Sequence, residues 1–208
     1  REALWINLQQ PFAHIQKTAL FFRKQDFHVA HRDPRRLLVR IQNDHFQSWC
    51  LVAHAPQSGI AFGDRQIWWD ETKEILHRSL FPGEQFFMCI DANAAPGVPD
   101  GVSVFNQGFK HSSGTPLLRD FLDDFELCLP ITSAAHQGSV TTWTSPDDAE
   151  YTIDYVAIPR VWQSACNHSC VLTDFDLANV NLDHSAAAID LQWTQASAHH
   201  ARDRKSVV

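Results

Sequence analysis

Short apolar runs alternate with turn-forming residues along most of the chain. Runs of roughly four to eight such residues between turn signals are typical of β-strands. A short Asp-Pro segment separates two of the runs and predicts a hairpin between residues 27 and 42. The pattern predicts strands at residues 3–8, 27–31, 37–42, 48–55, 85–90, 141–145, 152–159, 169–173 and 186–193.

Two longer segments have the spacing of amphipathic helices, at residues 64–80 and 115–127. The second is predicted to start with Thr115 as its N-cap and Pro116 in the first turn. Many strands with two helices between them predict an α+β domain, in which helices pack outside stacked sheets. We assign this domain to residues 1–195 and expect the polar tail, 196–208, to be a linker or a disordered segment.

The composition limits the class of protein. Of the 208 residues, 44% are hydrophobic and 20% charged, which is typical of a globular protein with a sizeable core. No apolar run approaches the roughly 20 residues that span a bilayer. The chain starts at Arg1 without an initiating Met or a signal peptide, so we expect a domain of a longer intracellular protein. Its five cysteines favour a reducing compartment without a disulfide framework.

Charge is distributed unevenly. The net charge of −7 argues against a protein held on nucleic acid by bulk charge alone. Eight of the 17 Lys and Arg residues lie within the first 40 positions, whereas residues 145–190 contain eight acids and one Arg. Such an acidic stretch is usually a solvated face, but it is also the pattern of a divalent-cation site.

Polar residues interrupt several strands where each strand ends or begins. The apolar run before Asp91 is followed two residues later by Asn93, and alternate residues of a strand share a face. We therefore expect Asp91 and Asn93 to project together. His54 follows another apolar run, Asp154 lies within one, and the pair Asp183-His184 precedes one.

Each of these residues alone has a simple structural explanation, such as a turn, a cap or a bond to the backbone. Together they supply the groups that phosphoester hydrolysis needs. Carboxylates hold a hard cation through oxygen, an Asp–His pair orients an imidazole, and an amide donor contacts phosphate oxygens.

Four short segments also match the motifs of one superfamily, in the same order and at similar spacings. They are His54-Ala55-Pro56, Ile90-Asp91-Ala92-Asn93, Thr142-Trp143 with Ile153-Asp154-Tyr155, and Leu182-Asp183-His184. From about residue 4 to residue 193, the chain thus resembles the endonuclease/exonuclease/phosphatase superfamily. Its members include deoxyribonucleases, abasic-site endonucleases, inositol polyphosphate phosphatases and the endonuclease domains of non-LTR retrotransposons.

The resemblance implies a fold and a set of roles. The fold would be a four-layer α/β/β/α sandwich of two stacked mixed sheets with flanking helices, lacking the first strands. Asp91 would orient or deprotonate the attacking water, and Asn93 would bind the phosphate. Asp154 would pair with His184, which would contact a phosphate oxygen, and His54 would contact the phosphate or assist the leaving group. Asp183 and Asp91 would bind Mg²⁺, with Mn²⁺ as the alternative ion.

The chain departs from the family pattern in two places. Ile90 and Ala92 replace a Gly and a Phe, and we expect the strand to absorb both changes. The family also carries a metal-binding Asn and Glu on its first two strands, upstream of the segment that Arg1 begins. We therefore expect the domain to be incomplete at its N-terminus, to bind Mg²⁺ weakly and to cut DNA slowly or not at all.

Three interpretations remain open. The first is a Mg²⁺-dependent endonuclease acting on DNA, of the retroelement or deoxyribonuclease-like type. Such a domain could be fused to a reverse transcriptase and located in the nucleus, without contact with a membrane. The second is a phosphatase acting on a phosphorylated small molecule or lipid, and the third is an inactive binding domain of the same fold. No Lys or Arg run lies beside Asp91, His54 or His184 in the sequence, which favours the nuclease over an inositol phosphatase.

Overall fold

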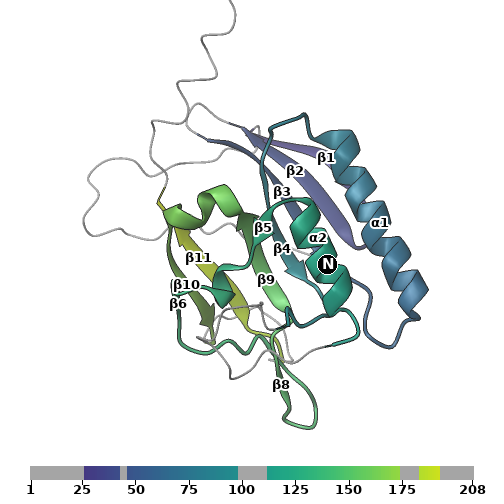
Figure 1. The fold of residues 1–208 in the computed structure, drawn as a ribbon, viewed down its shortest axis with the longest axis vertical. Coiled ribbons are helices and arrows are strands. Elements are labelled where there is room, and N and C mark those ends of the chain that lie inside the picture. The colour runs from purple at the N-terminus through teal and green to yellow at the C-terminus, as the bar shows by residue number, and fades with distance from the viewer. Residues whose placement is uncertain (1–25, 43–45, 98–111, 174–182, 193–208) are drawn as a thin grey trace, which may run out of the picture.

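The computed structural model describes residues 26–42, 46–97, 112–173 and 183–192 (Figure 1). The predicted strand at residues 3–8, the tail and the predicted domain boundary near residue 195 lie outside the described residues. In chain order the elements are β1 (Phe27–Arg32), β2 (Arg36–Gln42), β3 (Gln47–His54), α1 (Phe62–Ser79), β4 (Phe86–Asp91), α2 (Thr115–Asp124), β5 (Leu127–Cys128), η2 (Pro130–Thr132), β6 (His136–Gln137), β7 (Trp143–Thr144), β8 (Glu150–Tyr151), β9 (Asp154–Pro159), η3 (Arg160–Ala165), β10 (Cys166–Leu172) and β11 (Ala186–Leu191).

The larger sheet has six strands in the order β1-β2-β3-β4-β9-β5. β3 and β4 are parallel, and every other neighbouring pair in this sheet is antiparallel. A parallel pair needs a crossover connection, and α1 provides it between β3 and β4. As a result, β3 and β4 both end at the same edge of the sheet.

Both α-helices pack on one face of this sheet (Figure 1). Phe86, Met88 and Ile90 alternate along β4 and are buried against the helices. The rings of Trp69 from α1 and Phe121 from α2 lie 5.0 Å apart in the same core. Because side chains alternate along a strand, the last residue of β4 points to the opposite face.

The opposite face of β2 and β3 has a smaller apolar cluster. Val39, Ile41 and Cys50 are buried there, and Val52 and Phe87 pack against them. The larger sheet is therefore apolar on both faces, as expected for a sheet that is covered on both sides.

The five cysteines of the chain are all free thiols.

The smaller sheet has three strands in the order β11-β10-β6, and β7 and β8 form a separate two-stranded hairpin. β10 is antiparallel to β11 and parallel to β6. The chain is thus an α+β protein with two stacked mixed sheets, as the sequence predicted. Both α-helices of the described residues pack on the larger sheet, so the predicted fourth layer has no α-helix in this part of the chain.

Most predicted elements are present, with small differences at their ends. The hairpin between residues 27 and 42, the helix α1 and the strands β3 and β4 are confirmed. α2 ends at Asp124, earlier than predicted, and its N-cap is Gly114 rather than Thr115. The Thr115 hydroxyl instead donates to the Ala95 carbonyl at 2.8 Å, which ties the start of α2 to the loop after β4.

Gly114 permits this close contact between α2 and the loop. A Cβ atom at Gly114 would lie 2.8 Å from the Cβ of Ala94, closer than packed side chains approach. The loop that follows β4 is therefore held tightly against the start of α2.

Neither helix of the described residues is long and apolar enough to cross a membrane.

Candidate active site

Neighbouring strands of the larger sheet place three polar side chains in a row. In the parallel pair β3–β4, His54 lies directly beside Asp91. In the antiparallel pair β4–β9, Asp91 lies directly beside Asp154. Directly paired residues of neighbouring strands point to the same face of a sheet. The row His54, Asp91, Asp154 therefore lies at one edge, on the face away from α1 and α2.

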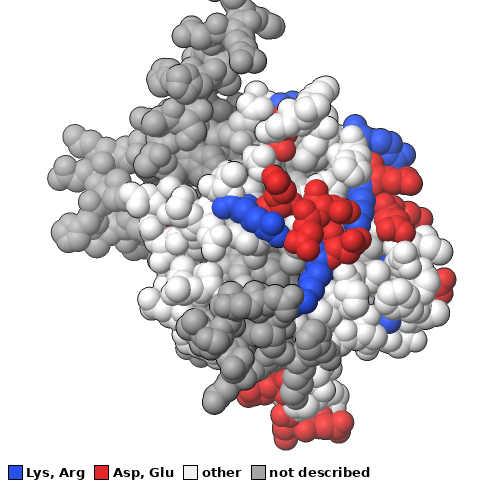
Figure 2. All heavy atoms as spheres, in the orientation of Figure 1, with Lys and Arg blue, Asp and Glu red and all other residues white. Residues whose placement is uncertain are grey.

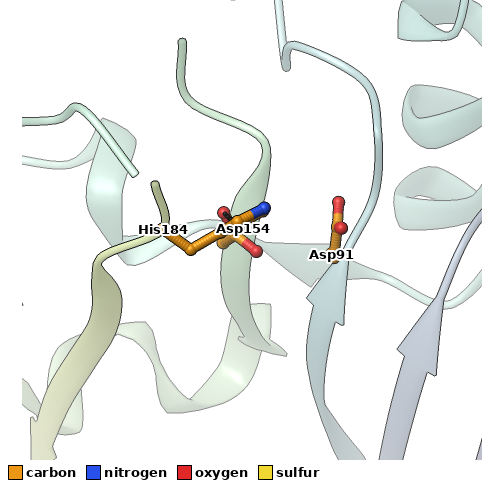
Figure 3. Close-up of side chains that lie close together, drawn as sticks. All are labelled: Asp91, Asp154 and His184. Atoms are coloured by element: carbon orange, nitrogen blue, oxygen red, sulfur yellow. Dashed lines mark hydrogen bonds and ion pairs between the residues drawn. The ribbon is translucent and has the colours of Figure 1, made fainter. Parts of the chain in front are cut away.

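His184 reaches this row from the segment that leads into β11. Its Nδ1 atom lies 3.0 Å from Oδ2 of Asp154, within hydrogen-bonding distance. Figure 3 shows His184 beside Asp154, with Asp91 on the neighbouring strand. The hydrogen bond between Asp154 and His184 that the family resemblance implies is thus present. It joins the larger sheet to the end of the smaller one.

Thr142 holds the start of β9 in place, a role that the sequence analysis did not predict. Its side chain is fully buried, and its Oγ1 accepts hydrogen bonds from the backbone N–H groups of Ile153 and Asp154, both at 3.0 Å. Its backbone N–H donates to the Tyr151 carbonyl, and its carbonyl accepts from Ser185. One residue thus positions both members of the Asp–His pair, and the Thr-Trp motif was the signal for it.

Asp91 is an acid in an unfavourable environment. Burial raises its pKa, and the negative charge of Asp154 raises it further. The Asn93 backbone N–H donates to Oδ1 of Asp91 at 3.0 Å and offsets part of this effect. His54 Nε2 lies 3.5 Å from Oδ2 of Asp91. The net result is a pKa above the ordinary value, so this carboxylate is a stronger base than a solvated aspartate.

The pKa of His184 is raised, which favours the cationic form of its imidazole. The hydrogen bond that His184 donates to Asp154 raises the pKa of His184, while burial lowers it by less. The negative charges of Asp154, Asp91 and Asp183 add to the increase. The imidazolium therefore persists to a higher pH than that of a free histidine.

Asn93 lies close to Asp91, but not for the reason that the sequence pattern suggested. β4 ends at Asp91, and Asn93 has a left-handed backbone with a φ of 46°, which asparagine adopts more readily than most residues. Its side-chain Nδ2 donates to the Ala55 carbonyl at 2.8 Å. The expected strand alternation is thus wrong here, and Asn93 joins Asp91 to the loop after β3. Phosphate binding by Asn93 stays a prediction.

Asp183 lies beside the group rather than inside it. The residue is exposed, and its backbone carbonyl accepts a hydrogen bond from Thr144 at 2.9 Å. Its charge acts on His184, as described above. Its carboxylate is not among the three ligand groups that converge in the described residues, so its role as a metal ligand stays a prediction.

The donor atoms of Asp91, Asp154 and His184 all lie within 4.8 Å of one another. Two of the three are carboxylates, and oxygen atoms are the ligands that Mg²⁺ and Mn²⁺ prefer. Burial and the negative charge of Asp154 both raise the pKa of Asp91, so the two carboxylates repel each other at close range. A divalent cation would relieve this repulsion, so the residues present fit such an ion.

Comparison with known proteins by sequence finds no protein-family model and no curated protein that matches the chain. Comparison with solved structures finds many matches. A 3′ phosphatase from Neisseria, NExo, solved with a product DNA hairpin, has a TM-score of 0.59 and 15% identity over 81% of this chain and 71% of that chain.

Two further solved structures are similar. An AP endonuclease from Archaeoglobus fulgidus has a TM-score of 0.56 and 14% identity over 80% of this chain and 71% of that one. The endonuclease domain of TRAS1, a telomere-specific non-LTR retrotransposon, has a TM-score of 0.54 and 13% identity over 81% of this chain and 70% of that one. At these identities the likeness shows a shared fold.

Proposed function

We propose that this chain, which has the fold shared by exonucleases, endonucleases and phosphatases, is a divalent-metal-dependent phosphodiester hydrolase that acts on DNA. The observation that carries the proposal is the convergence of Asp91, Asp154 and His184, which come from three separate segments. The fold alone does not determine which reaction a protein catalyses, so the proposal rests on the chemistry of these three side chains.

Asp91 and Asp154 would hold the cation through carboxylate oxygens, and Asp183, which the family resemblance implies as a ligand, would be a further one. When bound, such a cation neutralises negative charge that develops on the phosphate during attack. Mg²⁺ is the ion we propose, and Mn²⁺, which takes similar oxygen ligands, is expected to replace it.

Asp91 is the group we assign to the attacking water. Its raised pKa strengthens it as a proton acceptor, because a base works best when its pKa approaches the working pH. The hydrogen bond from the Asn93 backbone fixes one of its oxygens at 3.0 Å. The other oxygen faces His54, so both sides of the carboxylate are positioned by the fold.

His184 is the group we assign to a non-bridging phosphate oxygen. Its Nδ1 is engaged by Asp154, so its Nε2 is the nitrogen left to donate to a substrate. A positively charged imidazole stabilises the extra negative charge of the transition state. We assign His54, at the far end of the row, to the phosphate or to the leaving group, as the family resemblance implies.

The solved structures with the same fold favour DNA as the substrate. One of them was solved with a DNA hairpin product, and others are described as endonucleases. Because the first is described as a 3′ phosphatase, a phosphatase of the same fold is the second candidate.

A nicking assay on supercoiled plasmid tests the proposal, with Mg²⁺ or Mn²⁺ and with excess chelator as the metal-free arm. The purified chain is compared with Asp91→Ala, and with Asp123→Asn as a matched control. Asp123 lies on α2 and pairs with Arg160, away from the row. Metal-dependent nicking by the chain and the control, and not by Asp91→Ala, is the expected result.

Other outcomes have defined meanings. Release of phosphate from a 3′-phosphorylated oligonucleotide without nicking would favour the phosphatase. DNA binding without hydrolysis of either substrate would favour an inactive binding domain.

From the likeness to the TRAS1 domain, we also propose that the gene encodes a reverse transcriptase in the same reading frame and that the protein acts in the nucleus. Sequencing of the full reading frame tests the fusion, and imaging of a tagged full-length protein tests the location.

A further inference from the structure

The turn between β1 and β2 lies at the same edge of the larger sheet as the candidate active site. β2 starts at Arg36, which pairs with Ala53, and β3 ends one residue later. The backbone N–H of His54 donates to the Arg35 carbonyl at 2.9 Å. The basic turn, residues 32–36, is therefore in direct contact with the end of the strand that carries His54.

The turn contains one carboxylate, that of Asp33, and its negative charge is paired with His31 and Arg36. Asp33 bonds to Arg36 Nε at 2.7 Å and to His31 Nε2 at 3.0 Å. Burial alone would raise the pKa of Asp33, but hydrogen bonds from His31, the Arg35 backbone and Arg36 together lower it to about 2. Among the described residues, no carboxylate forms an ion pair with Arg32 or Arg35.

Arg35 is held beside the site by the last residue of β3 and the first residue after it. Its Nη1 donates to the carbonyls of His54 at 3.2 Å and Ala55 at 3.3 Å. The Ala55 carbonyl also accepts the side chain of Asn93 at 2.8 Å. The guanidinium and the Asn93 amide thus meet at one oxygen atom. A half-buried cation is thus held against the backbone of His54, the first residue of the row, and its remaining N–H groups have no hydrogen bond within the described residues.

Most other basic side chains of the described residues are used in ion pairs. A guanidinium that is held in place and has no counter-ion differs from these, because its charge is available to an anion from outside. The paired side chains include Arg36, Arg40, Lys73 and Arg160.

We propose that Arg35, with the exposed Arg32, binds a backbone phosphate of the DNA strand other than the phosphate that is cleaved. The inference rests on the proposed function and deepens it, since a substrate with one phosphoester has no second phosphate to offer. A planar guanidinium matches two phosphate oxygens at once, so a flanking phosphate at this turn would set the position of the strand across the row.

Binding is measured first, by fluorescence anisotropy of a labelled DNA duplex in chelator, where no hydrolysis interferes. The variants are Arg35→Ala, Arg35→Gln and Arg32→Ala. Arg78→Ala is the control, because Arg78 is exposed near the far end of α1 and its pair with Glu74 is 3.9 Å long.

We expect Arg35→Ala and Arg32→Ala each to weaken DNA binding on the order of fivefold. Each should also reduce the slope of log Kd against log salt by about one, the signature of one lost phosphate contact. The control should change neither quantity. Unchanged affinity and salt slope in both Arg variants would overturn the inference. It would also be overturned if inorganic phosphate displaced the labelled duplex at the same concentration as unlabelled DNA does.

Hydrolysis gives the second measurement, with DNA and with bis(4-nitrophenyl) phosphate as a diester that has one phosphate. Arg32→Ala and Arg35→Gln should lower kcat/KM for DNA and leave the small diester unchanged. Equal losses on both substrates in Arg35→Gln would show that Arg35 acts only by holding the His54–Ala55 loop, and would overturn its phosphate contact.

The two proposals can fail separately. A chain that hydrolyses nothing but binds DNA through both arginines refutes the hydrolase and leaves this inference standing. A chain that cuts DNA equally well without either arginine refutes the inference alone. A folded chain that neither binds nor cuts DNA refutes both.

Discussion

Carboxylates on the helical side of the molecule and carboxylates at the sheet edge have different partners. On the helical side, Lys73 of α1 bonds to both Asp120 and Asp124 of α2, and Arg160 bonds to Asp123. Figure 2 shows acidic and basic side chains interleaved over this surface. Each of these acids faces a cation that keeps its charge at any ordinary pH.

At the sheet edge, Asp91 and Asp154 face each other, and their nearest basic partners are the histidines His54 and His184. Unlike lysine or arginine, a histidine is cationic only when it is protonated, so these partners give the two carboxylates no permanent positive charge. This difference separates an arrangement that stabilises the fold from one that we propose binds a cation and a phosphate. Burial and repulsion, which raise the pKa of Asp91, make the second arrangement costly for stability.

Replacement of one acid in each region should give the largest contrast. Asp91→Asn removes the proposed base and one cation ligand, so we expect plasmid nicking to fall by about 10²- to 10⁴-fold. Asp120→Asn on the helical side should leave the rate within about twofold, because the residue is exposed and pairs with Lys73 of α1 rather than with a residue of the row. Comparable losses in both variants would remove the distinction between the two regions.

Divalent cations should act on the sheet edge alone. At roughly 100 times its Kd, Mg²⁺ should raise the Tm by about 5–10 °C, measured by differential scanning fluorimetry. Asp91→Asn should lose most of this increase, while Asp120→Asn should keep it. A similar increase in both variants would place the cation elsewhere on the protein.

The Asp154–His184 pair should set the alkaline limit of activity. Asp154 raises the pKa of His184, so Asp154→Asn should lower that pKa toward the ordinary histidine value. The imidazolium, present below its pKa, would then be lost at a lower pH, and activity should decline earlier as pH rises. NMR titration of His184 measures the shift directly, and an unchanged titration would contradict the assigned pairing.

Stability should respond in opposite directions in the two regions. In chelator at pH 7, Asp91→Asn should raise the Tm by a few degrees, because it removes a buried charge that repels Asp154 and keeps the oxygen that accepts from Asn93. A raised pKa means that the native state binds the proton more tightly. The advantage of Asp91→Asn should therefore shrink as pH falls through the pKa of Asp91.

The smallest effect should come from the helical side. Lys73→Ala removes a cation from between two exposed acids, and such surface pairs contribute about 1 kcal/mol or less. Chemical denaturation should show a loss of that size, and it should diminish as salt is added. A loss several times larger, or one that salt leaves unchanged, would mean that Lys73 acts through packing rather than charge.

The sequence alone determined most of the local structure and the segments that carry the candidate chemistry. Apolar runs that end at His54 and Asp91 do end strands β3 and β4, since the pattern of burial and the turn residues both act locally. The motifs also pointed to the Asp154–His184 pair and to the two stacked sheets, because a family pattern carries long-range information that periodicity lacks.

Only the tertiary structure decided how these segments meet. The register that places His54, Asp91 and Asp154 in one row depends on pairing between strands far apart in the chain. Strand alternation failed for Asn93, because the chain turns into a left-handed conformation as soon as β4 ends. Arg35 shows the same limit. Nothing in its neighbourhood in the sequence reveals that the end of β3 and the residue after it, 19 and 20 residues away, supply the two carbonyls that hold its guanidinium.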